Sequence, residues 1–124
     1  MSLARNEPVG YIPGSQDDIG GLWVVKHYLL EGEYLVPFEE LAELIPTHRA
    51  FLQKGYDDGH FLCSGPQIPA RGGFLLARAE SREKLEALLA EEPFTKARKM
   101  RFSRITEFNP VQHQPFLREW FGQA

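Results

Sequence analysis

The alternation of hydrophobic and polar residues along the chain predicts four strands and two helices. The first strand is predicted at residues 22–30, L-W-V-V-K-H-Y-L-L, because β-branched and aromatic side chains dominate there. Period-two alternation places Trp23, Val25, His27 and Leu29 on one face of this strand. The segment E-G-E-Y-L-V-P that follows is predicted to turn the chain.

Three more strands are predicted in the second half of the chain. Residues 61–66 and 74–79 are short apolar runs separated by a Pro- and Gly-rich connection, which is typical of a hairpin. Residues 100–108, M-R-F-S-R-I-T-E-F, also alternate, but the phase slips once within the run. Such a slip predicts a β-bulge in the last strand.

The first helix is predicted to begin at Pro37, where the missing backbone N–H costs nothing. Its apolar positions keep a helical spacing as far as the D-D-G stop at 57–59, so Pro46 is expected to kink or restart the helix without ending the pattern. His48 falls on the inward face. The positions that define this face are Leu41, Leu44, Ile45, Phe51, Leu52 and Tyr56.

The second helix is predicted to follow Ser81, a preferred N-cap residue, and to end before Pro93. Leu85, Leu88 and Leu89 form its apolar stripe. The resulting order, β-α-β-β-α-β, is that of the ferredoxin-like motif, an α+β fold in which both helices cover one face of a four-stranded antiparallel sheet.

That fold leaves the other face of the sheet without cover, yet the predicted strands carry apolar residues in both phases. A second copy of the chain, packed sheet to sheet, is the simplest cover and predicts a homodimer. The apolar residues that suggest this are Trp23, Phe61, Phe74 and Phe102.

The domain organisation follows from composition. Residues 1–21 are rich in Gly, Pro, Ser and Asp and are expected to form a flexible N-terminal arm. Residues 22–112 form the ferredoxin-like domain. Residues 113–124 include the aromatic run P-F-L-R-E-W-F and are expected to form a tail that docks on the domain or on the partner copy.

Length and charge exclude several classes of function. A chain of 124 residues fits one domain, and 43% hydrophobic with 25% charged residues is ordinary for a globular protein. A net charge of −3 gives no reason to expect nucleic acid or an anionic membrane. No run approaches the roughly 20 apolar residues of a membrane span, and no secretory signal is recognisable, so a cytoplasmic location is expected.

Metal and disulfide chemistry are not expected either. Cys63 is the single cysteine, so it has no disulfide or zinc partner and is predicted to be a small buried residue. His27, His60 and His113 lack the paired spacing of metal ligands and are assigned to packing or to the surface. No metal and no cofactor are predicted.

His48 and Glu92 are the residues whose position most invites a chemical role. A neutral imidazole turned toward a core needs hydrogen-bond partners, and a nearby carboxylate would tune its protonation. A packing histidine explains the pattern equally well. Glu92, at the end of the second predicted helix, places negative charge where it opposes the helix dipole and therefore needs a compensating contact.

The hairpin connection supplies candidate substrate-binding groups. Ser64 and Gly65, in S-G-P, and Arg71, in A-R-G-G, combine small residues that let backbone approach a ligand with a possible anion contact. Ordinary turn chemistry accounts for the same residues more simply, and no phosphate-loop spacing is present.

Taken as an ordered series, several motifs over residues 22–110 resemble the YciI-like (YCII-related) domain family. They are H-R-A-F-L, the Gly55 and Gly59 spacing, F-L-C-S-G-P, R-G-G-F-L-L-A-R, S-R-E-K-L-E-A-L-L and E-P-F. The resemblance implies a dimeric α+β barrel with an active site made by a helix histidine, here His48, and an aspartate in an aspartate-proline-aromatic motif. Glu92 stands at that aspartate position, one methylene longer.

The resemblance also suggests a reaction class, since related dimeric barrels include muconolactone isomerase-like enzymes and a dehydrochlorinase. It predicts a cofactor-independent lyase or isomerase in which His48 moves a proton on a small oxygenated or aromatic substrate. Glu92 would orient the imidazole, and Ser64 or nearby backbone N–H groups would hold an oxyanion. The alternatives are a non-catalytic small-ligand-binding or regulatory module, and an interaction protein with a filled barrel.

Overall fold

The computed structural model describes residues 25–122 of the chain. The predicted N-terminal arm and Trp23 lie outside the described residues. The elements are β1 (Lys26–Tyr34), the 3-10 helix η1 (Phe38–Leu44), α1 (Ile45–Asp57), β2 (Phe61–Pro66), β3 (Gly72–Ala79), α2 (Arg82–Leu89), α3 (Pro93–Lys96), β4 (Met100–Phe108), the 3-10 helix η2 (Pro115–Leu117) and α4 (Arg118–Phe121).

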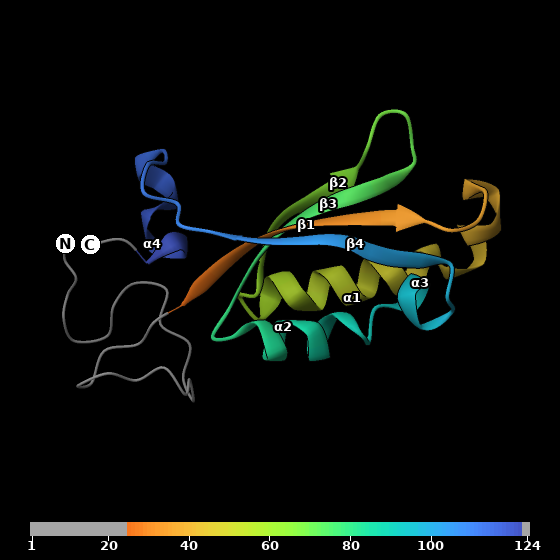
Figure 1. Ribbon diagram of the computed structural model, residues 1–124, viewed down its shortest axis with the longest axis horizontal. Coiled ribbons are helices and arrows are strands. Elements are labelled where there is room, and N and C mark those ends of the chain that lie inside the picture. The colour runs from red at the N-terminus through yellow and green to blue at the C-terminus, as the bar shows by residue number, and fades with distance from the viewer. Residues whose placement is uncertain (1–24, 123–124) are drawn as a thin grey trace.

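The four strands form one antiparallel sheet in the order β2-β3-β1-β4, and α1, α2 and α3 all lie on one face of it (Figure 1). The ferredoxin-like α+β arrangement is therefore confirmed. The predicted bulge is confirmed as well, because Glu31 pairs with Arg104 while Gly32 pairs with Phe102, which leaves Ser103 of β4 as the extra residue.

β1 runs four residues further than predicted, through the segment that was expected to turn. The alternation continues there, since Glu31 and Glu33 pair with residues of β4 on the open face while Gly32 and Tyr34 face the helices. Arg101 Nε donates a 2.9 Å hydrogen bond to Glu33 Oε1 across this pairing. Acidic residues and Gly suggested a turn, but cross-strand pairing with basic residues supports a strand.

The helices begin and end at residues that fit their chemistry. η1 follows Pro37, and α1 then begins at Ile45 with Pro46 in its first turn, so Pro46 restarts the helix as the pattern allowed. The Ser81 hydroxyl accepts a 3.2 Å hydrogen bond from the Lys84 backbone N–H and caps α2, as predicted. Pro93, expected only to stop the second helix, is the first residue of α3.

The main core lies between the sheet and helices α1 and α2. It contains Tyr28 and Leu30 of β1, Leu75, Ala77 and Ala79 of β3, Phe61 of β2, and Leu85 and Leu89 of α2. A smaller cluster of Leu41, Phe94 and Met100 joins η1, α3 and the start of β4. The pocket described below lies where these two clusters meet the β2–β3 hairpin.

The opposite face of the sheet has little cover. Leu29, Phe74 and Phe108 on this face are 44%, 44% and 38% exposed. Cys63 is also exposed, which corrects the prediction of a buried thiol: β2 is an edge strand, and Cys63 pairs with Leu76 in the phase that faces away from the helices.

The aromatic tail lies against one end of this open face. The His27 ring contacts the rings of Trp120 and Phe121, at centroid distances of 5.7 and 5.3 Å. The Arg78 guanidinium donates a 2.6 Å hydrogen bond to the Trp120 carbonyl and lies 4.8 Å from the centre of its ring. In the described part of the chain, no helix has the length and apolar character needed to cross a bilayer.

Candidate active site

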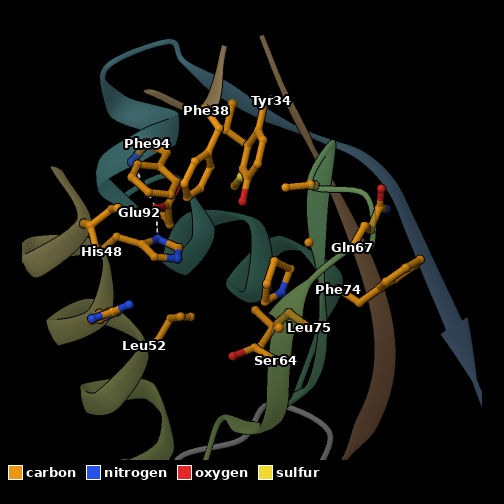
Figure 2. A pocket seen from close by; sticks show the side chains of 18 of the residues that line it. Tyr34, Phe38, His48, Leu52, Ser64, Gln67, Phe74, Leu75, Glu92 and Phe94 are labelled. Carbon is orange, nitrogen blue, oxygen red and sulfur yellow. Dashed lines mark hydrogen bonds and ion pairs between the residues drawn. The ribbon is translucent and has the colours of Figure 1, made fainter. Parts of the chain in front are cut away.

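A cavity of about 560 Å³ lies between α1, η1 and α3 on one side and the β2–β3 hairpin on the other (Figure 2). Its walls are mainly apolar. Aromatic side chains contribute from five positions: Tyr34, Phe38, Phe51, Phe94 and Phe102. Phe74 also borders the cavity, but its ring points away from it toward the open face of the sheet. A mainly apolar cavity of this size with a few polar groups is typical of sites for small organic molecules.

His48 and Glu92, 44 residues apart in the chain, meet at this cavity. His48 Nδ1 lies 2.6 Å from Glu92 Oε2. The His48 side chain is 23% exposed, whereas Glu92 is 1% exposed, so only the imidazole is presented to an incoming molecule. The two side chains thus meet at an open cavity, as predicted from the sequence.

Glu92 is held by the first turn of α3. Its Oε2 also accepts a 3.0 Å hydrogen bond from the Phe94 N–H, and its Oε1 accepts bonds from the Thr95 N–H and the Thr95 hydroxyl at 2.8 and 2.7 Å. Burial raises the pKa of the Glu92 carboxyl, but the hydrogen bonds from His48, Phe94 and Thr95 outweigh burial and hold that pKa below its ordinary value. Glu92 is therefore a carboxylate at neutral pH.

This position also explains the acidic residue that seemed misplaced. Glu92 was expected at the C-terminal end of the second helix, where its charge would oppose the dipole. α2 instead ends at Leu89, and Glu92 is the N-cap residue of α3, where its carboxylate satisfies two backbone N–H groups. The same side chain thus organises the start of α3 and binds His48.

The bond to Glu92 determines which His48 nitrogen carries the proton. An ionised carboxylate can only accept hydrogen bonds, so Nδ1 is the donor, and the neutral imidazole is left with a lone pair on Nε2. The ring stacks on Phe94 at 4.1 Å between centroids and 10° between planes. Figure 2 shows the ring turned so that Nε2 points into the cavity.

Tyr34 supplies a second polar group. Its ring contacts Phe38 and Phe94, and Figure 2 shows its hydroxyl pointing into the cavity across from His48. Burial, followed by the negative charge of Glu92, raises the pKa of the Tyr34 hydroxyl. Tyr34 is therefore a protonated donor at neutral pH, and its hydroxyl forms no hydrogen bond with residues 25–122.

Two of the three hairpin residues predicted to bind substrate line the cavity, and the third does not. Ser64 and Gly65 line the cavity, although the Ser64 hydroxyl is already hydrogen-bonded to the Tyr56 hydroxyl. Arg71 is exposed and lies outside the residues that line the cavity. The arginine that lines it is Arg49, which is next to His48 on α1 and is exposed as well.

Arg49, Tyr34 and Gln67 are the polar lining residues that the sequence did not suggest, and the Gln67 amide donates a 3.3 Å hydrogen bond to Glu31. Arg49 is part of the motif H-R-A-F-L, so its adjacency to His48 was the available signal. Tyr34 lies in the segment that was expected to turn, and its inward position depends on the longer β1.

The remaining histidines lie elsewhere. His27 is buried against the tail, where burial and then the charge of Arg78 lower its pKa to about 4. His60 follows α1, and His113 precedes η2, with its Nδ1 3.0 Å from the Gln114 carbonyl. Within residues 25–122, no group of three or more His, Cys, Asp or Glu side chains is placed to hold a metal ion.

Comparison with known proteins adds the fold neighbours and the family. No curated protein sequence matches the chain significantly. Among solved structures, 5-chloro-2-hydroxyhydroquinone dehydrochlorinase from Burkholderia phenoliruptrix, in complex with 2,5-dihydroxybenzoquinone, is similar with a TM-score of 0.54 and 20% identity, covering 73% of this chain and 97% of that chain. This likeness supports the fold. The family model for the YCII-related domain matches residues 21–109, and the chain therefore belongs to the YCII-related domain family.

Proposed function

We propose that this protein is a cofactor-independent lyase or isomerase that transfers a proton on a small oxygenated aromatic substrate. The observation that carries the proposal is the His48–Glu92 pair at the wall of an open aromatic cavity, with His48 Nε2 directed into it. A general base must reach the proton that it removes, and a buried carboxylate behind the imidazole stabilises the imidazolium that forms.

The roles of the individual residues follow from their contacts. His48 Nε2 would accept a proton from the substrate, and Glu92 would fix the tautomer and the ring orientation through Nδ1. Tyr34 replaces Ser64 as the preferred donor to a substrate oxygen, because its hydroxyl is unengaged among the described residues whereas that of Ser64 is bound to Tyr56. The aromatic walls would hold the ring and exclude water.

The choice of substrate class draws on the structural neighbour, a dehydrochlorinase of 5-chloro-2-hydroxyhydroquinone in complex with 2,5-dihydroxybenzoquinone. An aromatic cavity of about 560 Å³ fits a single-ring compound of this kind. The cavity also favours a small-molecule role over a pure interaction protein, which would need no hollow. A measurement of turnover distinguishes an enzyme from a ligand-binding module that does not convert its ligand.

The test combines binding and turnover with two histidine variants. The native protein is incubated with 5-chloro-2-hydroxyhydroquinone while released chloride is measured, and 2,5-dihydroxybenzoquinone is used as a binding probe in thermal unfolding. We expect His48→Asn to lower the rate of chloride release by about 10²- to 10⁴-fold, which is the usual contribution of a general base. His113→Asn, a histidine away from the cavity, is the matched control and should react like the native protein.

Two outcomes would contradict the proposal in different ways. If His48→Asn turned over as fast as the native protein, His48 would not be the base. If the native protein bound the quinone without any turnover of hydroxylated or chlorinated rings, the lyase assignment would fail and the ligand-binding module would remain.

A further inference from the structure

Arg49 is the one permanently charged cation among the described residues that line the cavity. The other ionisable groups there, apart from the Tyr34 phenol, are His48 and Glu92, which are bound to each other. A guanidinium stays protonated in proteins, so Arg49 contributes a full positive charge whatever the state of His48. Arg49 is also exposed, so water solvates its charge when no ligand is bound.

No described residue neutralises this charge. Arg49 forms no hydrogen bond or ion pair with any residue in the range 25–122, whereas Arg82 and Arg101 bind Glu86 and Glu33, each at 2.9 Å. The carboxylate of the cavity, Glu92, is 1% exposed and its oxygens already accept four hydrogen bonds. It has no capacity left for Arg49.

An entering ligand thus meets aromatic walls, one imidazole, the Tyr34 hydroxyl and one guanidinium that has no partner among the described residues. Because Arg49 is exposed, its attraction for an anion becomes stronger than in water only where a bound ring displaces water from between the two charges. A guanidinium also presents a planar set of donors that matches two neighbouring oxygens of a carboxylate or of an ionised hydroxyquinone. These features favour a ring that carries a negative charge.

We propose that Arg49 is the specificity-determining residue of this cavity and that it selects aromatic or quinonoid rings bearing an ionised oxygen. The inference rests on the proposed function for the kind of ring, but it concerns recognition and not the proton transfer. A neutral ring of the same shape would fill the cavity and leave Arg49 without a partner.

The experiment compares two probes of similar shape by titration calorimetry. 2,5-Dihydroxybenzoquinone has acidic hydroxyls and is anionic at neutral pH, and 2,5-dimethoxybenzoquinone is neutral. We expect the native protein to prefer the anionic probe. Arg49→Gln should weaken binding of the anion about tenfold or more, equivalent to about 1.4 kcal/mol, and should leave the neutral probe nearly unchanged. Arg49→Lys keeps the charge without the planar fork of donors, so its affinity for the anionic probe should lie between those of the native protein and Arg49→Gln.

Two further arginine variants make the result specific. Arg118→Gln removes the same charge from the exposed start of α4, so it should not change the preference. Arg71→Gln tests the other candidate arginine, in the hairpin. If Arg71→Gln lost the preference for the anionic probe and Arg49→Gln kept it, the inference would be overturned. An equal preference in native protein and Arg49→Gln, or no binding of the anionic probe to native protein, would overturn it too.

Failure here is separable from failure of the proposed function. His48→Asn should keep the preference for the anionic probe while losing turnover. If Arg49→Gln kept the preference and His48→Asn still abolished turnover, the proton-transfer role would stand and the anion-selecting role of Arg49 would not.

Discussion

Glu92 illustrates how one side chain can determine both a local fold and a chemical state. It caps α3 through the N–H groups of Phe94 and Thr95, and it binds the His48 ring through Nδ1. Because both carboxylate oxygens are engaged and the group is buried, it has little freedom to swing. The orientation of the imidazole is therefore fixed by the start of α3 as much as by α1.

The lowered pKa of Glu92 leads to a prediction on acid stability. A carboxyl whose pKa is lower in the folded protein than in the unfolded chain stabilises the fold above the unfolded value of about 4.5, and that contribution is lost as pH falls through the folded pKa. Glu92→Gln should lower the free energy of unfolding at pH 7 by about 2 kcal/mol or more, since its amide cannot accept all of these bonds. Denaturant titrations between pH 7 and 3 should show the difference from native protein shrinking below about pH 4.5.

Glu91→Gln is the matched control, because Glu91 is exposed and pairs only with exposed Lys96 at 3.3 Å. It should change stability by well under about 1 kcal/mol. His27 adds its own loss between about pH 6.5 and pH 4, since the unfolded chain takes up a proton that the folded protein resists. That loss is common to all variants and cancels in the difference. A Glu92→Gln effect independent of pH would contradict the prediction.

The sequence predicted part of this site. His48 and Glu92 were found because the motifs around them resemble the family's, and their chemistry could then be reasoned from residue type. Arg49 and Tyr34 were not found, because whether a side chain lines a cavity depends on the tertiary approach of segments, which a single sequence does not contain. Arg71 was chosen for its charge in a Gly-rich loop, but it is exposed and is not among the residues that line the cavity.

At the scale of elements, the contact of α1 with β2 positions His48 relative to the hairpin. Gly55 is the buried residue of α1, and a Cβ placed on it would lie 2.1 Å from two ring carbons of Phe61. Phe61 is 2% exposed and is confined by the rings of Phe51 and Tyr56. The ring cannot move aside cheaply, so α1 approaches the sheet this closely only because residue 55 has no side chain.

Gly55→Ala should therefore destabilise the protein even though alanine favours helices. The overpacking cost, about 1–3 kcal/mol or more, exceeds the gain in helix propensity of about 1 kcal/mol. The matched control is Gly65→Ala, where an added Cβ meets nothing within 4 Å. Thermal unfolding of the two variants should show a lower melting temperature for the first only. An unchanged melting temperature for Gly55→Ala would mean that α1 does not pack on Phe61 in this way.

The elements were predicted best where the hydrophobic periodicity or a strong residue preference points to a single local structure. The phase slip in residues 100–108 predicted the bulge opposite Glu31 and Gly32, and Ser81 was correctly identified as a cap. Predictions failed where one residue type fits two local structures. Pro93 can follow one helix or begin the next, and only the hydrogen bonds of Glu92 decide that it begins α3.

At the scale of the whole molecule, the cavity and the uncovered apolar surface lie on different faces of the sheet. The cavity lies on the side of α1 and α3, while Leu29, Phe108 and the partly buried Leu76 lie on the side away from these helices. A second copy packed on the open face would bury those side chains and leave access to His48. A dimer formed through the open face would therefore not block the candidate active site.

We predict that the protein is a dimer formed through this open face, since a contiguous exposed apolar patch on a sheet usually marks an interface. Light scattering after size-exclusion chromatography should give twice the 14.2 kDa mass of the chain. Leu29→Glu places a charge at the centre of the sheet and should yield monomers, because burying an unpaired carboxylate costs several kcal/mol. Leu35→Glu makes the same change at an apolar residue that is 50% exposed after the end of β1, and it should leave the dimer intact. A native protein that stays monomeric at micromolar concentration, or dimers that persist in Leu29→Glu, would rule out this interface.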